Sequence, residues 1–246
     1  MTNVVIASAA RTAVGSFGGS FANTPAHDLG TAVLEALVER AGVDKGEVSE
    51  TILGQVLTAA QGQNPARQAL DLAAKKDIPP GLGDLVFQGN GTAEVLLVSD
   101  PFCPYCKQAF AFFAQNTDRL ANWRLLHLPY SQKQGADVAS WAIMDGAQYV
   151  PGLDLARFAY TDLEPAAQDQ EIIEQFMQKF PKLREQWGSP EKASYYLKGK
   201  YQAQTRQAKQ RAQKGLDIQA TPKAFIDGVP VKGYAPQRYA SLLHRS

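Results

Sequence analysis

The stretch Glu94-Val-Leu-Leu-Val-Ser-Asp-Pro-Phe-Cys-Pro-Tyr-Cys106, followed by Lys107-Gln-Ala-Phe-Ala-Phe-Phe-Ala-Gln115, sets the architecture of most of this chain. Its first part is an apolar run typical of a buried strand, and its last part joins good helix formers to Phe110 and Phe113, three positions apart. The pattern predicts a strand that delivers a Cys-x-x-Cys motif to the start of a helix. The chain has two cysteines and both lie in this motif, which is typical of dithiol redox proteins.

The two cysteines are expected to differ in their position on this helix. Cys103 falls at or just before the first turn, where unpaired N–H groups and the helix dipole favour a thiolate. Pro104 suits the first helical position, because its φ is already helical and its missing N–H would have had no partner, and Tyr105 completes the motif. We expect Cys103 to be the nucleophile and Cys106, more buried, to release a bound substrate by closing the internal disulfide.

Two simpler interpretations of the motif are half of a zinc site and a structural disulfide. Zinc needs four ligands, and beyond the cysteines the sequence offers only His27, His127 and His244, none of them paired at ligand spacing. A disulfide that closes so small a loop removes little entropy from the unfolded chain. We therefore expect a redox motif with no metal and no cofactor.

The segments around the motif predict a thioredoxin-like α/β fold. Apolar strand patterns lie at residues 83–87, 94–98, 123–128, 224–226 and 229–232, with Gly228 at a hairpin turn and a last helix over about 236–243. The order is β-β-α-β, a long interruption, and then β-β-α, which is the order of a thioredoxin-like core.

The interruption, at about residues 131–215, is predicted to be a helical insertion. Apolar residues follow a 3.6-residue period after Pro165, and Ser189-Pro190-Glu191 is a helix-start signal for a run that ends at Gly215. Lys192 to Lys214 carries seven Lys and Arg and no acid. We interpret this run as a solvated helix surface rather than a nucleic-acid face, since the net charge of the chain is +1.

Two segments carry a resemblance to a known family. Ser99-Asp-Pro-Phe-Cys-Pro-Tyr-Cys-Lys-Gln-Ala-Phe110 and Ala220-Thr-Pro-Lys-Ala-Phe-Ile-Asp-Gly-Val-Pro-Val-Lys-Gly-Tyr-Ala-Pro236 resemble the DsbC/DsbG family of bacterial periplasmic thiol:disulfide isomerases. In that family a Thr-Pro step with a cis proline faces the disulfide, which points to Thr221 and Pro222 as substrate-binding residues. The resemblance also implies protein substrates, a redox partner protein and a periplasmic location.

The first 70 residues follow a different pattern. They predict a βαβα segment, with strands at 4–7 and 51–57 and helices opened by Thr24-Pro25 and Asn64-Pro65. The glycines of the loop at 15–19 do not have the spacing of a nucleotide-binding loop.

This segment resembles a second family. Val4-Val-Ile-Ala-Ser-Ala-Ala-Arg-Thr-Ala-Val-Gly-Ser-Phe17 and Ile52-Leu-Gly-Gln-Val-Leu-Thr-Ala-Ala-Gln-Gly-Gln-Asn-Pro-Ala-Arg-Gln68 are similar to the opening of a bacterial acetyl-CoA acetyltransferase, a biosynthetic thiolase. Thiolases use a cysteine that lies further along their chain, whereas here no cysteine precedes Cys103. We expect no thiolase activity from a chain made of a thiolase-like fragment (1–70), a linker (71–82) and a thioredoxin-like domain (83–246).

Composition sets the expectations for compartment. No apolar run reaches the roughly 18 residues of a membrane helix, so we expect no membrane span. The N-terminus lacks the basic region and the long apolar run of a signal peptide. The redox domain thus implies the periplasm, whereas the N-terminus, if native, indicates the cytoplasm.

The motif favours an enzyme of thiol:disulfide interchange, and the family resemblance favours an isomerase or reductase. A DsbA-like net oxidant and a non-catalytic Cu(I)-binding or chaperone-like module remain as alternatives. Two strands and two helices cannot cover both faces of a parallel sheet. The N-terminal fragment is therefore expected either to dock on the redox domain or to pair with a second chain, and we favour the homodimer slightly.

Overall fold

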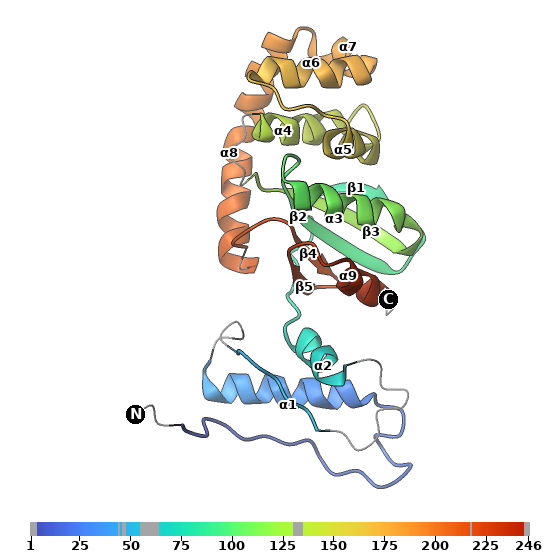
Figure 1. Ribbon diagram of the computed structural model, residues 1–246, viewed down its shortest axis with the longest axis vertical. Helices are drawn as coiled ribbons and strands as arrows, with labels where there is room; N and C mark the ends of the chain where they lie inside the picture. Colours follow the sequence, from blue (N-terminus) through green and yellow to red (C-terminus); the bar gives the residue numbers. More distant parts are fainter. Residues whose placement is uncertain are drawn as a thin grey trace. The chain divides into compact units, whose positions relative to one another are not determined.

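The computed structural model describes residues 4–43, 45, 48–54, 64–129, 135–216 and 218–243. It divides into two compact units, which we call the N-terminal unit (residues 1–75) and the C-terminal unit (residues 76–246). Figure 1 shows the elements of each.

The N-terminal unit contains two helices at the places that the sequence predicts. Helix α1 (Ala26–Ala41) begins after Pro25 and ends at Gly42, whose φ of 64° is the left-handed conformation common after a helix. Helix α2 (Pro65–Ala73) follows Asn64, whose side-chain Oδ1 accepts a hydrogen bond from the Arg67 N–H at 2.9 Å. Local capping signals thus place both helices correctly.

The two strands expected in this unit are not formed in the part that is described. Residues 4–10 and 51–54 belong to no strand, and positions 55–57 lie outside the described residues. Val4, Ile6 and Ile52 are 98%, 93% and 80% exposed. A strand needs a hydrogen-bonded neighbour and an apolar one needs a covering layer, and the described residues of this unit supply neither to these segments.

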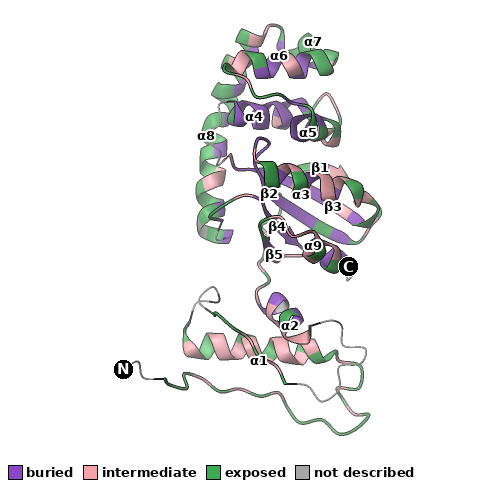
Figure 2. Cartoon of the chain, viewed as in Figure 1, coloured by how far each residue is buried: buried purple, intermediate pink, exposed green. Residues whose placement is uncertain are grey.

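The two helices of this unit pack closely against each other. A Cβ on Gly30 would lie 3.1 Å from the Ala69 Cβ, and the Thr31 hydroxyl donates to the Ala69 carbonyl at 3.2 Å. Ala69 is fully buried, yet α1 contains no buried residue. In Figure 2, α1 carries only the colours of intermediate and exposed residues, whereas α2 and the strands of the C-terminal unit include buried ones.

The C-terminal unit is built on a five-stranded sheet. The strands are β1 (Asp84–Gln88), β2 (Ala93–Ser99), β3 (Leu120–His127), β4 (Lys223–Ile226) and β5 (Val229–Lys232), in the order β1-β3-β2-β4-β5. Only the β2–β3 pair is parallel. Asp227 and Gly228 join β4 to β5 with φ of 50° and 81°, as a two-residue type I′ hairpin requires. All five strands lie where the sequence predicts them.

Helices cover both faces of this sheet, so its strands are apolar on both sides. On one face lie α3 (Pro104–Gln115) and α9 (Pro236–Leu243), and the residues that pack there include Val95, Leu97, Phe110, Phe113, Trp123 and Tyr239. On the other face lies the C-terminal part of α8 (Pro190–Leu216), and the residues that pack there include Leu96, Val98, Leu126, Ala212, Leu216 and Phe225. This two-sided core fixes the motif-bearing end of β2.

The helical insertion is formed as expected. It consists of α4 (Ala136–Gly146), α5 (Gly152–Thr161), α6 (Asp169–Lys179), α7 (Pro181–Trp187) and α8. Figure 1 shows α8 running alongside the other helices of the insertion and down beside the sheet. Residues 130–134, at its entrance, lie outside the described residues. The insertion is thus anchored to the sheet by its own last helix.

A buried carboxylate holds three helices of the insertion together. Asp145 on α4 is fully buried and accepts hydrogen bonds from Trp187 Nε1 on α7 at 2.8 Å and from Lys200 Nζ on α8 at 2.7 Å. The hydroxyls of Tyr196 and Tyr201, also on α8, donate to it at 3.2 and 2.9 Å. Burial acts to raise the pKa of Asp145, but these hydrogen bonds outweigh it and the pKa lies below its usual value.

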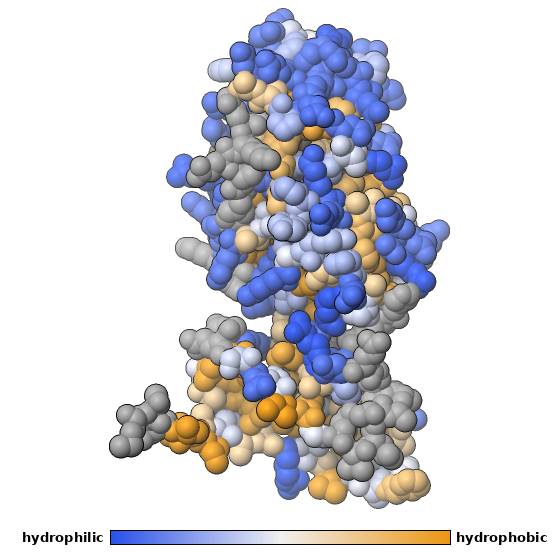
Figure 3. Space-filling view, viewed as in Figure 1, coloured by the Kyte–Doolittle hydropathy of each residue, from blue (hydrophilic) through white to orange (hydrophobic). Residues whose placement is uncertain are grey.

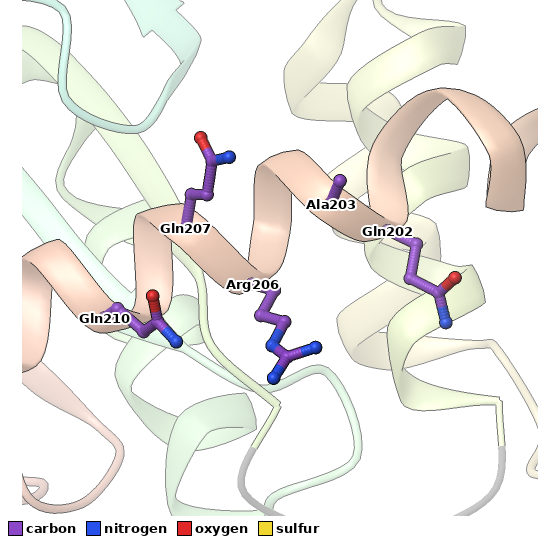
Figure 4. Close-up of a pocket in the computed structure, with 5 residues that line it drawn as sticks. All are labelled: Gln202, Ala203, Arg206, Gln207 and Gln210. Atoms are coloured by element: carbon purple, nitrogen blue, oxygen red, sulfur yellow. The ribbon is translucent and has the colours of Figure 1, made fainter.

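The outer surface of α8 is polar. A hollow of about 520 Å³ on it is lined by Gln202, Ala203, Arg206, Gln207 and Gln210 (Figure 4). All five residues come from this one helix, and within the described part of the chain no second element lines the hollow. Figure 3 shows mostly hydrophilic residues over much of the visible face of the C-terminal unit. Among the helices of the described residues, none has the length and apolar character needed to cross a membrane.

Candidate active site

The Cys-x-x-Cys motif lies at the junction of β2 and α3, as the sequence predicts. Cys103 is the N-cap of α3, in an extended conformation, and Pro104 is the first helical residue. Asp100 holds the preceding turn, because its carbonyl accepts the Cys103 N–H at 3.1 Å and its Oδ1 accepts the Phe102 N–H at 2.9 Å. The backbone thus presents Cys103 at the open end of the helix.

The two thiols differ sharply in exposure. Cys103 is half-buried and Cys106 is 0% exposed, and both are free thiols. Burial raises the pKa of the Cys106 thiol to about 12, while hydrogen bonds with the Thr221 side chain and the Asp100 backbone act in the opposite direction. At neutral pH Cys106 is therefore a protonated thiol, and Cys103 is the one that solvent and reagents can reach.

The chain brings a distant segment to the motif. The Thr221–Pro222 peptide bond is cis, as the family resemblance implies, and the Cys103 thiol faces the Thr221 carbonyl oxygen at 3.9 Å. A hollow of about 160 Å³ next to it is lined by residues 219–223 and by Lys232 and Gly233. Of the six expected site residues, Cys103, Cys106, Thr221 and Pro222 thus lie close together. The other two belong to the start of α3, where Pro104 is the first helical residue and the Tyr105 side chain is 62% exposed.

Two buried hydroxyls behind the motif were not anticipated. Ser99, the last residue of β2, and Tyr160, on α5, are both buried. The Tyr160 ring stacks on Phe110 of α3 with ring centroids 4.6 Å apart. Burial raises the pKa of Tyr160 well above its usual value, and negative charge on Cys106, Asp100 and Cys103 adds to this, while the Ser99 side chain opposes it. No sequence motif marks either residue.

A second buried titratable group lies at the end of β3. The His127 side chain is buried, its Nε2 lies 3.9 Å from the Asp84 carboxylate, and neither ring nitrogen has a hydrogen-bond partner among the residues that the structure describes. Burial lowers the pKa of His127 to about 4, and it raises that of Asp84 to about 6 against the charge of Arg124. Both residues line a cleft of about 270 Å³ that Met144 and Thr205 border. Within the described ranges no group of three or more His, Cys, Asp or Glu is placed to hold a metal ion.

Comparison with known proteins identifies the N-terminal segment. The model for the N-terminal domain of thiolases matches residues 4–80. The acetyl-CoA acetyltransferase of Paracoccus denitrificans is 80% identical over 69 residues, which are 28% of this chain and 18% of that protein. The enzyme of Cupriavidus necator is 53% identical over 100 residues, 41% of this chain and 25% of that protein. The chain thus spans no more than a quarter of the length of these two relatives, and the predicted thiolase resemblance is confirmed for this segment.

Solved structures identify the fold of the rest. Oxidised BdbD from Bacillus subtilis superposes with a TM-score of 0.54 at 16% identity, over 70% of this chain and 96% of that one. A thioredoxin-like oxidoreductase from Silicibacter pomeroyi superposes with a TM-score of 0.52 at 17% identity, over 67% of this chain and 92% of that one. The thiol-disulfide exchange protein alpha-DsbA2 from Wolbachia pipientis superposes with a TM-score of 0.51 at 12% identity, over 68% of this chain and 88% of that one. The predicted thioredoxin-like fold is confirmed.

Proposed function

We propose that the C-terminal unit exchanges thiols and disulfides on protein substrates. The observation that supports this most directly is the contrast between Cys103, reachable at the start of α3, and Cys106, fully buried in the next turn. In the first step the Cys103 thiolate attacks one sulfur of a substrate disulfide, forms a mixed disulfide and releases the other sulfur as a thiolate. Cys106 then attacks the Cys103 sulfur, which forms the internal disulfide and releases the substrate as a thiol. The substrate is reduced by two electrons and the enzyme is oxidised by two.

The segment facing the motif is proposed to bind the substrate. Residues 219–222 lead into β4, and the Thr221 carbonyl oxygen lies 3.9 Å from the Cys103 sulfur. An extended substrate segment would pair with this backbone by strand addition. The adjoining hollow, bordered by Pro222 and Lys232, would receive a substrate side chain. Tyr105 is exposed on the same turn as the nucleophile and is available to the substrate.

We propose an isomerase or reductase rather than a net oxidant. The basis is the resemblance of the segment around Cys103 to the DsbC/DsbG family, and that resemblance also favours a periplasmic location and a redox partner protein. A homodimer would place two motifs in one particle. A potential near −120 mV would instead identify a DsbA-like oxidant, and retention of Cu(I) without insulin reduction would identify a copper-binding module.

The test uses one variant of each cysteine. Cys103→Ser should abolish insulin reduction, whereas Cys106→Ser should accumulate a mixed disulfide with the substrate, seen by mass spectrometry without reductant. Iodoacetamide at neutral pH should label Cys103 of the reduced wild type first, because Cys106 is 0% exposed. First labelling of Cys106 would reverse the two roles, and insulin reduction by Cys103→Ser at the wild-type rate would reject the proposal.

We propose that the N-terminal unit does not catalyse acyl transfer. No cysteine precedes Cys103 in the sequence, and a thiolase needs one as its nucleophile. We expect no cleavage of acetoacetyl-CoA, because the nucleophile is missing. We also expect no binding of CoA, which would show as a raised melting temperature, since a ligand that binds the folded state stabilises it. A reproducible shift with CoA would contradict this.

A further inference from the structure

The hollow beside the Cys-x-x-Cys motif is bordered by two lysines. Its lining consists of residues 219–223 together with Lys232 and Gly233, and within the part of the chain that the structure describes it includes no Asp or Glu. The carbonyl oxygen of Thr221, one of the lining residues, lies 3.9 Å from the Cys103 sulfur. A substrate whose disulfide reaches Cys103 therefore comes next to this hollow.

The two lysines differ in what their ammonium groups can reach. The Lys223 side chain is 4% exposed, its Nζ donates to the Leu216 carbonyl oxygen at 2.8 Å, and the same Nζ lies 5.5 Å from the centroid of the Phe225 ring. Lys232 is exposed, and no hydrogen bond or ion pair joins its side chain to any residue that the structure describes. Lys232 is thus the cation at this hollow that a bound substrate can meet.

The strand pairing fixes the position of Lys232. It is the last residue of β5 and lies directly opposite Lys223 of β4 in the antiparallel register. The next residue, Gly233, donates its N–H to the Pro222 carbonyl oxygen at 2.9 Å, which ties the end of β5 to the segment that faces the motif. Like charges directly opposite each other destabilise an antiparallel pair. A negative charge brought to this position by a substrate is therefore favoured.

We propose that Lys232 determines specificity, and that the chain prefers protein substrates in which Asp or Glu flanks the reacting cysteine. This inference rests on the proposed function. A substrate segment that pairs with the backbone at Thr221 advances by about 3.3 Å per residue, so the neighbours of the attacked cysteine reach the hollow. Their carboxylate meets the Lys232 ammonium at the rim of the site, where a charge acts mainly on the association rate and is screened by salt.

The experiment uses three symmetric peptide disulfides, in which Glu, Gln or Lys flanks the cysteine on both sides. The rate constant for loss of each disulfide is measured with the reduced full-length protein and divided by its rate constant with dithiothreitol, which corrects for the intrinsic reactivity of the peptide. At low ionic strength we expect the Glu peptide to react about threefold faster than the Gln peptide, and the Lys peptide about threefold slower. In about 1 M salt these differences should shrink to within about 1.5-fold.

Variants assign the preference to one side chain. Lys232→Gln should remove most of it, Lys232→Glu should reverse it in favour of the Lys peptide, and Lys232→Arg should keep it. The matched control is Lys198→Gln, which also removes an exposed lysine but one on α8 that does not line the hollow, and it should retain the wild-type ratios.

Equal corrected rates for the three peptides with wild type, or a preference that Lys232→Gln retains in full, would overturn the inference. A preference for the Glu peptide that persists undiminished in about 1 M salt would do the same, and this measurement needs no variant. Failure of wild type to reduce any of the three peptides would instead contradict the proposed function itself.

Discussion

The N-terminal unit is close in sequence to acetyl-CoA acetyltransferases, and yet its longer helix contains no buried residue. The C-terminal unit shares at most 17% identity with the three solved structures named above, yet it has a sheet with a core on both faces. Identity over a segment reports common ancestry. Whether that segment holds a fold depends on the apolar surface that it can bury by itself.

The difference follows from how much of each architecture is present. The chain spans 18% to 25% of the two acetyltransferases compared, and the apolar side chains of Val4, Ile6 and Ile52 are exposed. It spans 88% to 96% of the three thioredoxin-like structures. A fold that is nearly complete tolerates extensive sequence change provided that its two-sided pattern is kept.

The largest expected effect comes from separating the units. Residues 76–246 alone should unfold cooperatively and keep the thiol exchange rate of the full chain, because both faces of the sheet are covered within this range. Residues 1–75 alone should give no cooperative transition by circular dichroism, because a small segment with few buried side chains cannot offset its conformational entropy. A sharp thermal transition of the isolated N-terminal unit would break the comparison.

Matched leucine substitutions should give the next largest effect. Leu97→Ala removes a side chain that is 0% exposed in the middle of the sheet, and it should lower the free energy of unfolding by about 3 kcal/mol or more. Leu34→Ala, in half-buried α1, should shift the unfolding transition reported by the tryptophans by less than about 1 kcal/mol, because Leu34 belongs to the other unit. The three tryptophans of the chain, Trp123, Trp141 and Trp187, all lie in the C-terminal unit, so their fluorescence in urea reports that unit alone. Equal shifts for both variants would mean that the units share one core.

A smaller effect concerns the dependence of stability on pH. Burial lowers the pKa of His127 from its ordinary value of 6.5 to about 4 in the folded protein, so its contribution is present above pH 6.5 and is lost as the pH falls towards 4. Full loss amounts to roughly 3 kcal/mol. The pKa of Asp84 is raised, to about 6. Its contribution therefore has the opposite sign, being present below pH 3.8 and lost as the pH rises through 6.

His127→Gln should thus flatten the loss of stability between pH 7 and pH 4.5, as measured by urea denaturation with tryptophan fluorescence. His27→Gln, in the N-terminal unit, is the matched control and should leave that transition as in wild type. An equally steep loss in His127→Gln would show that other groups carry the acid sensitivity.

The sequence predicted the strands of the C-terminal unit because each has an apolar pattern and a turn signal of its own, as Gly228 shows between β4 and β5. The strands at 4–7 and 51–57 carried equally good patterns, but a pattern does not reveal whether a partner strand is present. Spacing alone singled out Cys103 and Cys106, whereas Thr221 was reached only through the resemblance. Tyr160 and Ser99 could not be found, since they are far apart in the chain and meet only through the packing of α5 on α3.

The carboxylate of Asp145 has a consequence for the variation that this protein can accept. Its donors on α7 and α8, Trp187, Tyr196, Lys200 and Tyr201, converge on one group, so each of these donors has others to substitute for it, whereas the acceptor has none. In a library of single substitutions, each of the four donor positions should be more permissive than position 145. Because of this asymmetry, the residues of α7 and α8 that contact Asp145 could be substituted one at a time, whereas the acidic side chain that accepts their hydrogen bonds could not.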